Sequence, residues 1–410
     1  MAKLLWTQRT NFGPGPRNAS SITFDSNRNR VVLFGGSNTN GPLGDTWEWD
    51  GSFWTQMEDI GPAPRFASAM VYDTAHQVSL LFGGTNKEPL GDTWQWDGSD
   101  WTKLSESGPS PRVSHAMAFD STRNRTVLFG GQPSGTPPVN DTWEFDGQEW
   151  TQQQDTGPAP RSGHSMAYDS VSGHVISFGG IGIQGNTAAA FGDTWAWDGN
   201  TWAQIAEFGP SARGGAAMAA GAGNLILFGG VSSLEPSQAP EADTWGFDGK
   251  LWTQRQDIGP GPLQNASMAF DSNRSCAVLF GGLTVSTANA GNAALNPLSG
   301  STWESPITPT ASSLVSVSSL AVPSNVIGQV PTTLTINLSG PAPQSGALVT
   351  LAGGAFTPTG ANLPSVTIPA GLKTMDVPVA FAKQSAPVTV TISAQIAGTP
   401  AVSLQVLVGT

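Results

Sequence analysis

The sequence is poor in charge and in cysteine. Asp, Glu, Lys and Arg make up only 12% of its 410 residues, and the single cysteine, Cys276, cannot form a disulfide within the chain. The 18 basic residues are outnumbered by 30 acidic ones, which gives a net charge of −12. Because binding to phosphate needs clustered Lys and Arg, this balance argues against a nucleic-acid partner.

Long apolar runs are absent as well. No segment approaches the roughly 18–20 consecutive apolar residues of a membrane span, so we expect none. The opening residues, Met1 to Trp6, lack the apolar stretch of a secretory signal. Low cysteine content suits a bacterial exterior protein without disulfides as well as a protein of the reducing cytosol. We expect an extracellular or cell-surface location, with the signal outside this chain, and leave a cytoplasmic location open.

Turn-forming residues are abundant, and short strings of them recur. The chain has 50 Gly and 31 Pro, which is typical of many short strands joined by tight turns. Phe-Gly-Gly recurs at intervals of 47 to 52 residues, beginning at Phe34, Phe82, Phe129, Phe178, Phe228 and Phe280. Asp-Thr-Trp begins at Asp45, Asp92, Asp141, Asp193 and Asp243. Gly-Pro-x-x-Arg or a close variant ends at Arg17, Arg65, Arg112, Arg161 and Arg213. Six units of this length predict a β-propeller.

Each unit is predicted to form four strands. In the second unit the first three strands are Ala69–Asp73, Val78–Phe82 and Thr93–Trp96. Asp97-Gly98 then predicts a tight turn into a fourth strand that begins at Trp101.

The two ends of this region predict ring closure. In five units a third-strand Trp precedes a fourth-strand Trp by 7 residues, and two further tryptophans lack such a partner. Trp6 begins a fourth strand with no unit before it, and Trp303 lies in a third strand with no fourth strand after it. We therefore expect the N-terminal strand to complete the sixth blade and to remove its free edge.

These repeats resemble the kelch family. The kelch pattern is a Pro-Arg-x-x-His start, a double glycine and two spaced aromatics. Here it is matched by Pro111 to His115, Gly130-Gly131, Trp143 and Trp150, with Trp in place of the usual Tyr. The resemblance covers about residues 1–305 and implies an all-β, six-bladed kelch-type propeller.

The repeats also depart from the kelch pattern. Histidine follows Pro-Arg only as His115 and His164, and the sixth unit has Leu263 in place of Arg. The fifth unit has Gly221-Ala222-Gly223 where the others have an aromatic residue followed by Asp.

A second domain begins where the composition changes, at about residue 305. Beyond it there is no Trp or Tyr, and alternating runs such as Leu334–Leu338 and Val388–Ile392 predict half-buried strands. About seven strands suggest a sandwich, and segments 338–343 and 366–371 resemble bacterial immunoglobulin-like repeats. We therefore predict a propeller over 1–305, a linker over 306–313 and an Ig-like β-sandwich over 314–410.

The repeated arginines are the candidate binding residues. In a four-stranded blade the Gly-Pro-x-x-Arg segments and the loops between second and third strands share one face, and these loops vary in length. Arg17, Arg65, Arg112, Arg161 and Arg213, with His115 and His164, could bind a carboxylate there. The alternative is that each arginine bonds carbonyl groups of its own or the adjacent blade, which suits a residue present in nearly every unit.

Catalytic and metal-binding patterns are weak. The tryptophans recur in every unit, which favours packing over sugar binding, and the turn aspartates lack the spacing of a calcium loop. Copper-radical sugar oxidases resemble the chain in fold, but Tyr72 and Tyr168 occupy positions held elsewhere by Phe, which indicates core aromatics. Acidic residues in the variable loops are Glu88, Glu235 and Glu241. We expect no cofactor and no metal.

Two functions remain. The favoured hypothesis is a non-catalytic, exported binding or assembly module, with a protein or glycan ligand on the face that carries the variable loops. The alternative is a carbohydrate-active enzyme that resembles kelch-type sialic-acid mutarotases, which act on an anionic sugar.

Overall fold

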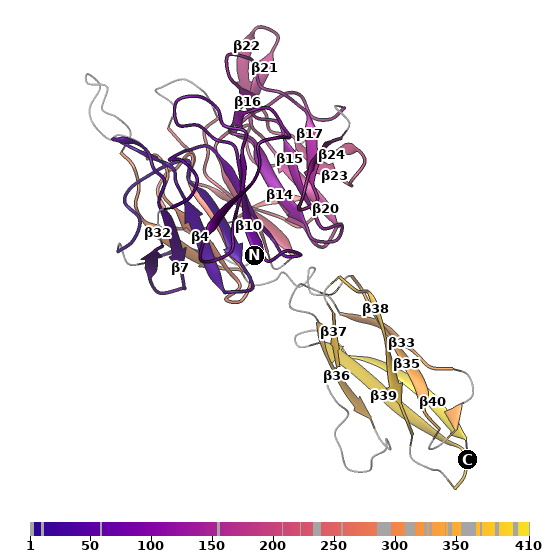
Figure 1. Cartoon of the computed structure of the whole chain (residues 1–410). Coiled ribbons are helices and arrows are strands. Elements are labelled where there is room, and N and C mark those ends of the chain that lie inside the picture. The colour runs from indigo at the N-terminus through magenta and orange to yellow at the C-terminus, as the bar shows by residue number, and fades with distance from the viewer. Residues whose placement is uncertain are drawn as a thin grey trace. The chain divides into compact units, whose positions relative to one another are not determined.

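The computed structural model divides the chain into two compact units, Met1–Thr308 and Pro309–Thr410 (Figure 1). It describes residues 4–9, 12–57, 60–153, 156–206, 208–221, 223–232, 239–255, 257–284, 297–307, 316–323, 326–327, 330–340, 342, 347–353, 366–369, 371–381, 385–396 and 401–409. The described residues form strands, turns and loops, with no helix among them. The fold is therefore all-β.

Unit 1 contains six four-stranded antiparallel sheets in its described residues. The strands of each sheet are given from the first strand of the repeat to the fourth. Sheet 1 has β3 (Ser21–Asp25), β4 (Arg30–Phe34), β7 (Thr46–Trp49) and β8 (Trp54–Gln56), and sheet 2 has β9 (Ala69–Asp73), β10 (Val78–Phe82), β11 (Thr93–Trp96) and β12 (Trp101–Ser105). Sheet 3 has β14 (Ala116–Asp120), β15 (Arg125–Phe129), β17 (Thr142–Phe145) and β18 (Trp150–Gln152), and sheet 4 has β19 (Ser165–Asp169), β20 (His174–Phe178), β23 (Thr194–Trp197) and β24 (Trp202–Ala206). Sheet 5 has β25 (Ala217–Gly221), β26 (Asn224–Phe228), β27 (Thr244–Phe247) and β28 (Trp252–Arg255), and sheet 6 has β30 (Ser267–Asp271), β31 (Cys276–Phe280), β32 (Thr302–Pro306) and β2 (Thr7–Gln8). The strands predicted for the second repeat are confirmed as β9, β10 and β11.

The first strands of the six sheets contact one another in a closed cycle, in the order β3, β9, β14, β19, β25, β30 and back to β3. Directly before these strands, one residue from each repeat donates its backbone N–H to the carbonyl of the equivalent residue in the preceding sheet, over 2.7–2.9 Å. These residues are Ala19, Ala67, Ser114, Gly163, Gly215 and Asn265. The bond from Ala19 to Asn265 closes the cycle, so the amide ring joins all six sheets.

All six residues of the amide ring have a positive φ, between 50° and 64°. Glycine adopts this left-handed conformation without steric penalty, whereas an alanine pays a cost of about 1–2 kcal/mol. The two glycines, Gly163 and Gly215, are therefore the residues best suited to the ring, and Ala19 and Ala67 are held there by the surrounding bonds.

The N-terminal strand lies at the outer edge of sheet 6. Thr7 pairs with Glu304 and Gln8 with Trp303, and the Arg9 N–H donates to the Thr302 carbonyl. Just before this strand, β1 (Leu4–Leu5) pairs in parallel with β29 (Asp257–Ile258). The strand pairing expected from the unpartnered tryptophans is therefore present between residues nearly 300 positions apart in the sequence.

Trp6 occupies the same place as the fourth-strand tryptophans of the other sheets. Its indole N–H donates to Thr244 Oγ1 of sheet 5. The other five indoles donate to the equivalent threonine of their own preceding sheet, as Trp54 to Thr302, Trp101 to Thr46, Trp150 to Thr93, Trp202 to Thr142 and Trp252 to Thr194. A side chain at Gly259 would clash with the Trp6 ring, because its Cβ would lie 2.5 Å from Cδ1. The hydrophobic core of unit 1 thus lies between the sheets, where large apolar side chains are buried.

The end of unit 1 differs slightly from the predicted boundary. Pro306 ends β32, and Ile307 is buried with its N–H donating to the Ser275 carbonyl. These two residues, which the composition places in the linker, are therefore held by sheet 6. Residues 308–313 of the predicted linker lie outside the described residues.

Unit 2 contains two sheets in its described residues. One has the strands β33 (Val317–Ala321), β35 (Thr332–Leu338) and β38 (Thr374–Val379). The other has the order β34 (Val326–Ile327), β40 (Val402–Gly409), β39 (Val388–Ile396), β36 (Ala347–Gly353) and β37 (Val366–Ile368). Alternating apolar side chains of both sheets, such as Leu334, Ile336, Val349 and Ile392, form one core.

Candidate functional site

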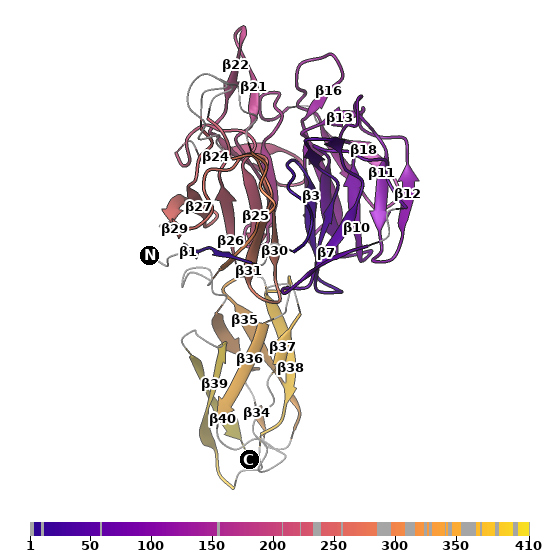
Figure 2. The ribbon, with the colours of Figure 1, turned by 90° about the vertical axis from the view of Figure 1, so that its left-hand side faces the viewer.

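The loops between second and third strands lie on the same face of unit 1 as the Gly-Pro-x-x-Arg segments, and we call this the loop face. Backbone bonds join the two, as from the Arg65 N–H to the Leu43 carbonyl. Two loops carry short hairpins, β5 (Ser37–Asn38) with β6 (Gly41–Pro42) and β21 (Ile181–Gln184) with β22 (Thr187–Ala190). In the third loop β16 (Gln132–Pro133) pairs instead with β13 (Arg112–Val113), which belongs to the Gly-Pro-x-x-Arg segment. The hairpin β21–β22 projects farthest in both views (Figures 1 and 2). Much of the fifth and sixth loops, residues 233–238 and 285–296, lies outside the described residues.

The five repeated arginines are bound inside their own sheets. Each guanidinium forms a bidentate ion pair with the aspartate of the Asp-Thr-Trp string. Nη1 lies 2.5–2.7 Å from Oδ1, and Nη2 lies 2.7–3.0 Å from Oδ2. The pairs are Arg17–Asp45, Arg65–Asp92, Arg112–Asp141, Arg161–Asp193 and Arg213–Asp243. Nη1 also donates to the first glycine carbonyl of Phe-Gly-Gly, and Nε to the carbonyl two residues earlier.

Burial leaves these arginines inaccessible to a ligand. Their exposed fractions are 0–2%, and in Arg112 and Arg213 a serine two residues earlier takes the fifth N–H. The paired aspartates also accept the indole N–H of the tryptophan two residues later. Burial raises the pKa of each aspartate, but the hydrogen bonds and charge of its arginine bring that pKa below the ordinary value. The geometry thus matches the alternative interpretation, in which the arginines are structural.

The sixth repeat lacks both members of this ion pair. Leu263 replaces the arginine and is buried, and Ser301 stands where the other repeats have aspartate. The backbone is unchanged, because the Gly281 N–H donates to the Ser301 carbonyl as the Gly35 N–H does to that of Asp45. The paired replacement avoids a buried, unpaired charge.

The two histidines are also buried. His115 and His164 are 5% and 6% exposed, and neither ring nitrogen of either residue has a hydrogen-bond partner. Burial, together with the positive charge of the neighbouring Arg112 or Arg161, lowers the pKa of both imidazoles to about 3. Both rings are therefore neutral near pH 7, and neither is open to a ligand on the loop face.

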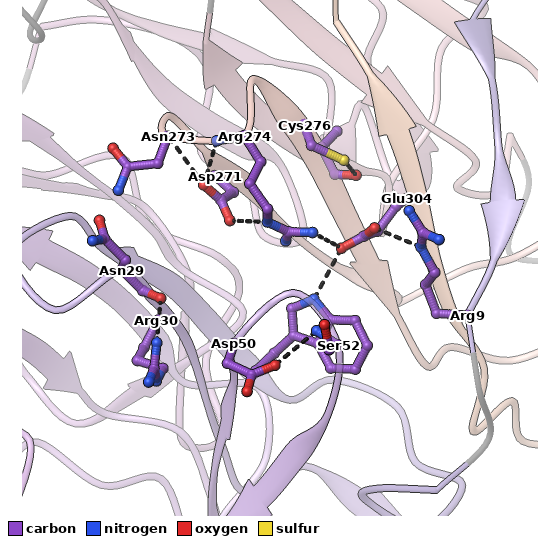
Figure 3. Close-up of polar contacts among 12 residues, drawn as sticks. Arg9, Asn29, Arg30, Asp50, Ser52, Asp271, Asn273, Arg274, Cys276 and Glu304 are labelled. Atoms are coloured by element: carbon purple, nitrogen blue, oxygen red, sulfur yellow. Dashed lines mark hydrogen bonds and ion pairs between the residues drawn. The ribbon is translucent and has the colours of Figure 1, made fainter.

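Three buried glutamates were not singled out by the sequence. Glu304 lies between two guanidinium groups, with Arg274 Nη1 at 2.5 Å from Oε1 and Arg9 Nε at 2.6 Å from Oε2 (Figure 3). Its Oε1 also accepts the indole N–H of Trp49 from sheet 1, at 2.9 Å. Glu48 and Glu144 have the same kinds of partner, an arginine of their own sheet and a tryptophan of the next. We call these clusters the glutamate nodes.

The glutamate nodes follow a rule across the six sheets. The arginine lies three residues after the aspartate that ends the first strand, and the complete sets are Arg28, Glu48 and Trp96; Arg123, Glu144 and Trp197; Arg274, Glu304 and Trp49. In two of the other three sheets the equivalent positions hold His76, Gln95 and Phe145, or Ser172, Ala196 and Phe247. In the remaining one, Gly246 of sheet 5 stands at the glutamate position and Ser305 of sheet 6 at the tryptophan position. A tryptophan therefore occurs only where the preceding sheet supplies a glutamate.

The remaining candidates do not gather into a site. Glu88 accepts a hydrogen bond from Ser134 Oγ at 3.2 Å, which links two loops, while Glu235 lies outside the described residues. Tyr72 is buried, and Tyr168 is partly buried against a core cluster, as expected of core aromatics. Among the described residues no group of three or more His, Cys, Asp or Glu side chains could hold a metal ion. In the same part of the chain, no helix is long and apolar enough to cross a membrane.

One family comparison bears on this architecture. The KLHDC2/KLHL20/DRC7 Kelch-repeats domain family matches residues 97–282. No curated protein matches the chain. The family match and the all-strand fold together support a kelch-type β-propeller, a fold that suggests a protein-interaction module.

Proposed function

We propose that the chain is a non-catalytic, exported protein-interaction module. In this proposal the six sheets of unit 1 are the blades of a six-bladed propeller, and unit 2 is an immunoglobulin-like sandwich that acts as a spacer. The amide ring and the closed cycle of first strands support six blades. The two sheets and shared core of unit 2 support a sandwich.

One observation carries the interaction function. The polar side chains that recur in the repeats, above all the five arginines, bind one another inside the protein. What differs between repeats is the set of loops on the loop face, where recognition is commonly built on a fixed scaffold. The family match favours a protein as the ligand.

A carbohydrate-active enzyme is the weaker proposal. It depended on an arginine-lined mouth that would hold an anionic sugar. With the five guanidinium groups buried and paired with aspartate, that mouth has no free arginine from the series. Export is supported by the charge-poor composition of unit 2, in which Lys373, Lys383 and Asp376 are the charged residues.

A loop replacement tests the proposed function. Replacing Gly182–Ala189 by Asn-Gly would shorten the hairpin β21–β22 to a tight turn between Ile181 and Ala190, which already pair. The matched control is Phe53→Ser, at an exposed position in the turn between third and fourth strands. We expect a protein captured from a cell extract by the wild type and the control, but not by the shortened variant. The proposal would be contradicted if an acidic sugar raised the melting temperature and the shortened variant captured the same proteins as the wild type.

A further inference from the structure

His115 and His164 fill equivalent positions at two neighbouring seams of unit 1, where a seam is the interface between two adjacent sheets. His115 lies between sheets 2 and 3, and His164 between sheets 3 and 4. The four other repeats place small side chains there, namely Ser20, Ser68, Ala216 and Ala266. A side chain that can take up a proton is therefore present at this position in only two of the six seams.

Each imidazole is wedged between two sheets. The His115 ring contacts Phe82 of sheet 2 edge to face, with ring centroids 5.4 Å apart. A Cβ atom added at Gly83 would lie only 2.8 Å from Cε1 of this ring. On the other side, a Cβ atom added at Gly131 of sheet 3 would lie 2.7 Å from the Cβ of His115. His164 repeats this arrangement against Phe129, at 5.4 Å, and beside Gly130 and Gly180.

The charged neighbours of the two rings do not offset the cost of burying a proton there: the aspartates favour the protonated ring, but burial and the arginines outweigh them. Arg112 and Asp141 act on His115, while Arg161, Asp193 and His115 act on His164. Each aspartate is already engaged by two guanidinium nitrogens and by an indole N–H. The Phe82 and Phe129 carbonyls favour a protonated ring but complete no hydrogen bond with it. A protonated imidazole in the closed seam would therefore be a buried cation beside another cation.

We propose that protonation of His115 and His164 opens these two seams, so that acid loosens the loop face locally. The loops at risk are 85–91 and 132–140, which are tied across the seams. The Arg112 N–H donates to the Leu90 carbonyl, and the Arg161 N–H to that of Val139. Because Ser134 and Glu88 connect the two loops, loosening one seam is expected to affect both. The inference does not depend on which partner binds the loop face.

Amide hydrogen exchange tests the proposal on the intact chain. The reporters are amides that bond across the two seams, Gly84, Arg112, Ser114, Gly131, Arg161 and Gly163. Between pH 7.5 and pH 5, we expect their exchange rates, corrected for intrinsic chemistry, to rise about 10- to 30-fold. Gly36, Arg65 and Ala67, which bond across the histidine-free seam between sheets 1 and 2, should change little. An equal rise at both sets of amides would overturn the local seam opening.

A variant assigns the effect to the histidines. His115→Ser with His164→Ser introduces the side chain that Ser20 and Ser68 supply at the same position, and it should abolish the acid-induced rise. The control is His76→Ser, a half-exposed histidine bound to Asp73 on the opposite face, which should leave the rise intact. An unchanged rise in the double variant would refute the proposal.

A second measurement needs no variant. Exchange of the imidazole C2 hydrogen, followed by mass spectrometry over a range of pH, reports the titration of each histidine in the wild-type protein. Slow exchange at His115 and His164, with midpoints well below 6.5, is expected. Midpoints near 6.5 for both rings in the folded protein would show that the closed seams tolerate protonation, and the proposal would fall.

Discussion

Glu304 accepts the indole N–H of Trp49 at 2.9 Å, so the last sheet of unit 1 is bonded directly to the first. The same carboxylate binds Arg9 of the closing strand and Arg274 of its own sheet. One side chain therefore connects the N-terminal strand, the sixth sheet and the first sheet. The two other glutamate nodes join neighbouring sheets in the same way, which makes the nodes the first target for mutation.

We predict that removing one glutamate costs more stability than removing its whole node. Glu48→Ala leaves the Trp96 indole and part of the Arg28 guanidinium without their partner, and we expect a loss of about 3 kcal/mol of stability. The triple change Arg28→Ser, Glu48→Ala and Trp96→Phe reproduces the natural set Ser172, Ala196 and Phe247 and should recover at least half of that loss. Denaturation followed by tryptophan fluorescence checks this, because all 15 tryptophans lie in unit 1. Strictly additive losses would contradict the prediction.

The arginine–aspartate pairs allow a parallel experiment. Arg112→Leu leaves Asp141 without its counter-ion in a mostly buried place, and we expect a loss of about 3–5 kcal/mol. Adding Asp141→Ser reproduces the natural pair Leu263 and Ser301 of the sixth repeat, so the double variant should be more stable than Arg112→Leu alone. Thermal unfolding monitored by fluorescence measures both. A double variant less stable than the single one would show that the sixth repeat depends on other changes.

The sequence predicts the strands of the repeats well, because each is marked by its own residues. Phe-Gly-Gly ends the second strand, and Asp-Gly separates the third strand from the fourth. Strand pairing at the closure was also readable, since Trp6 and Trp303 each lacked a partner in an otherwise regular series.

Side-chain contacts, within a sheet or between sheets, were not readable in the same way. Arginine and aspartate were both recognised as repeated, but nothing within one repeat shows that they meet, and the glutamates resembled ordinary third-strand residues. The signal was correlated change between repeats: Leu263 with Ser301, and Phe or Ser in place of Trp where the preceding glutamate is missing. The amide ring left still less trace, because Ala, Ser, Gly and Asn occupy its positions and the bonds involve only backbone atoms.

Ring closure by the N-terminal strand gives a third prediction. Deleting residues 1–10 removes the Trp6 side chain from its place against Gly259 and Phe228, and exposes the edge of β32. Burial of a tryptophan alone contributes about 3–5 kcal/mol, so the melting temperature of unit 1 should fall markedly. Trp6→Ala in the full chain should produce most of the same fall. An unchanged melting curve after the deletion would refute the role of this strand in closure.

The backbone conformation of the amide ring restricts which side chains its alanine positions can accept. Ala67 has a φ of 54°, a conformation that β-branched residues adopt only with strain. We expect Ala67→Val to reduce stability by about 2 kcal/mol or more, whereas Ala67→Gly should be neutral or slightly stabilising. Chemical denaturation of the two variants makes the comparison. Equal losses in both would mean that the methyl group of Ala67, rather than its backbone conformation, matters.

Stability should also fall in mild acid because of the buried histidines. Burial holds the pKa of His115 and His164 at about 3 in the folded protein, against an ordinary value of 6.5 in the unfolded chain. Between these values the unfolded chain binds more protons, so stability is complete above about pH 6.5 and declines as the pH falls toward 3. The decline is about 2 kcal/mol per histidine at pH 5. The five paired aspartates have pKa values below their ordinary 3.8, so their contribution is lost only in stronger acid.

Urea denaturation at a series of pH values from 7.5 to 3 separates the two groups. The wild type should lose stability steadily below pH 6.5, and His115→Ser with His164→Ser should flatten this slope while leaving the loss below about pH 4 in place. His76→Ser is the matched control, because that residue is half-exposed. If the double variant kept the full slope between pH 6.5 and 4.5, proton uptake in that range would have to come from other groups, and the two imidazoles would titrate alike in the folded and unfolded chain.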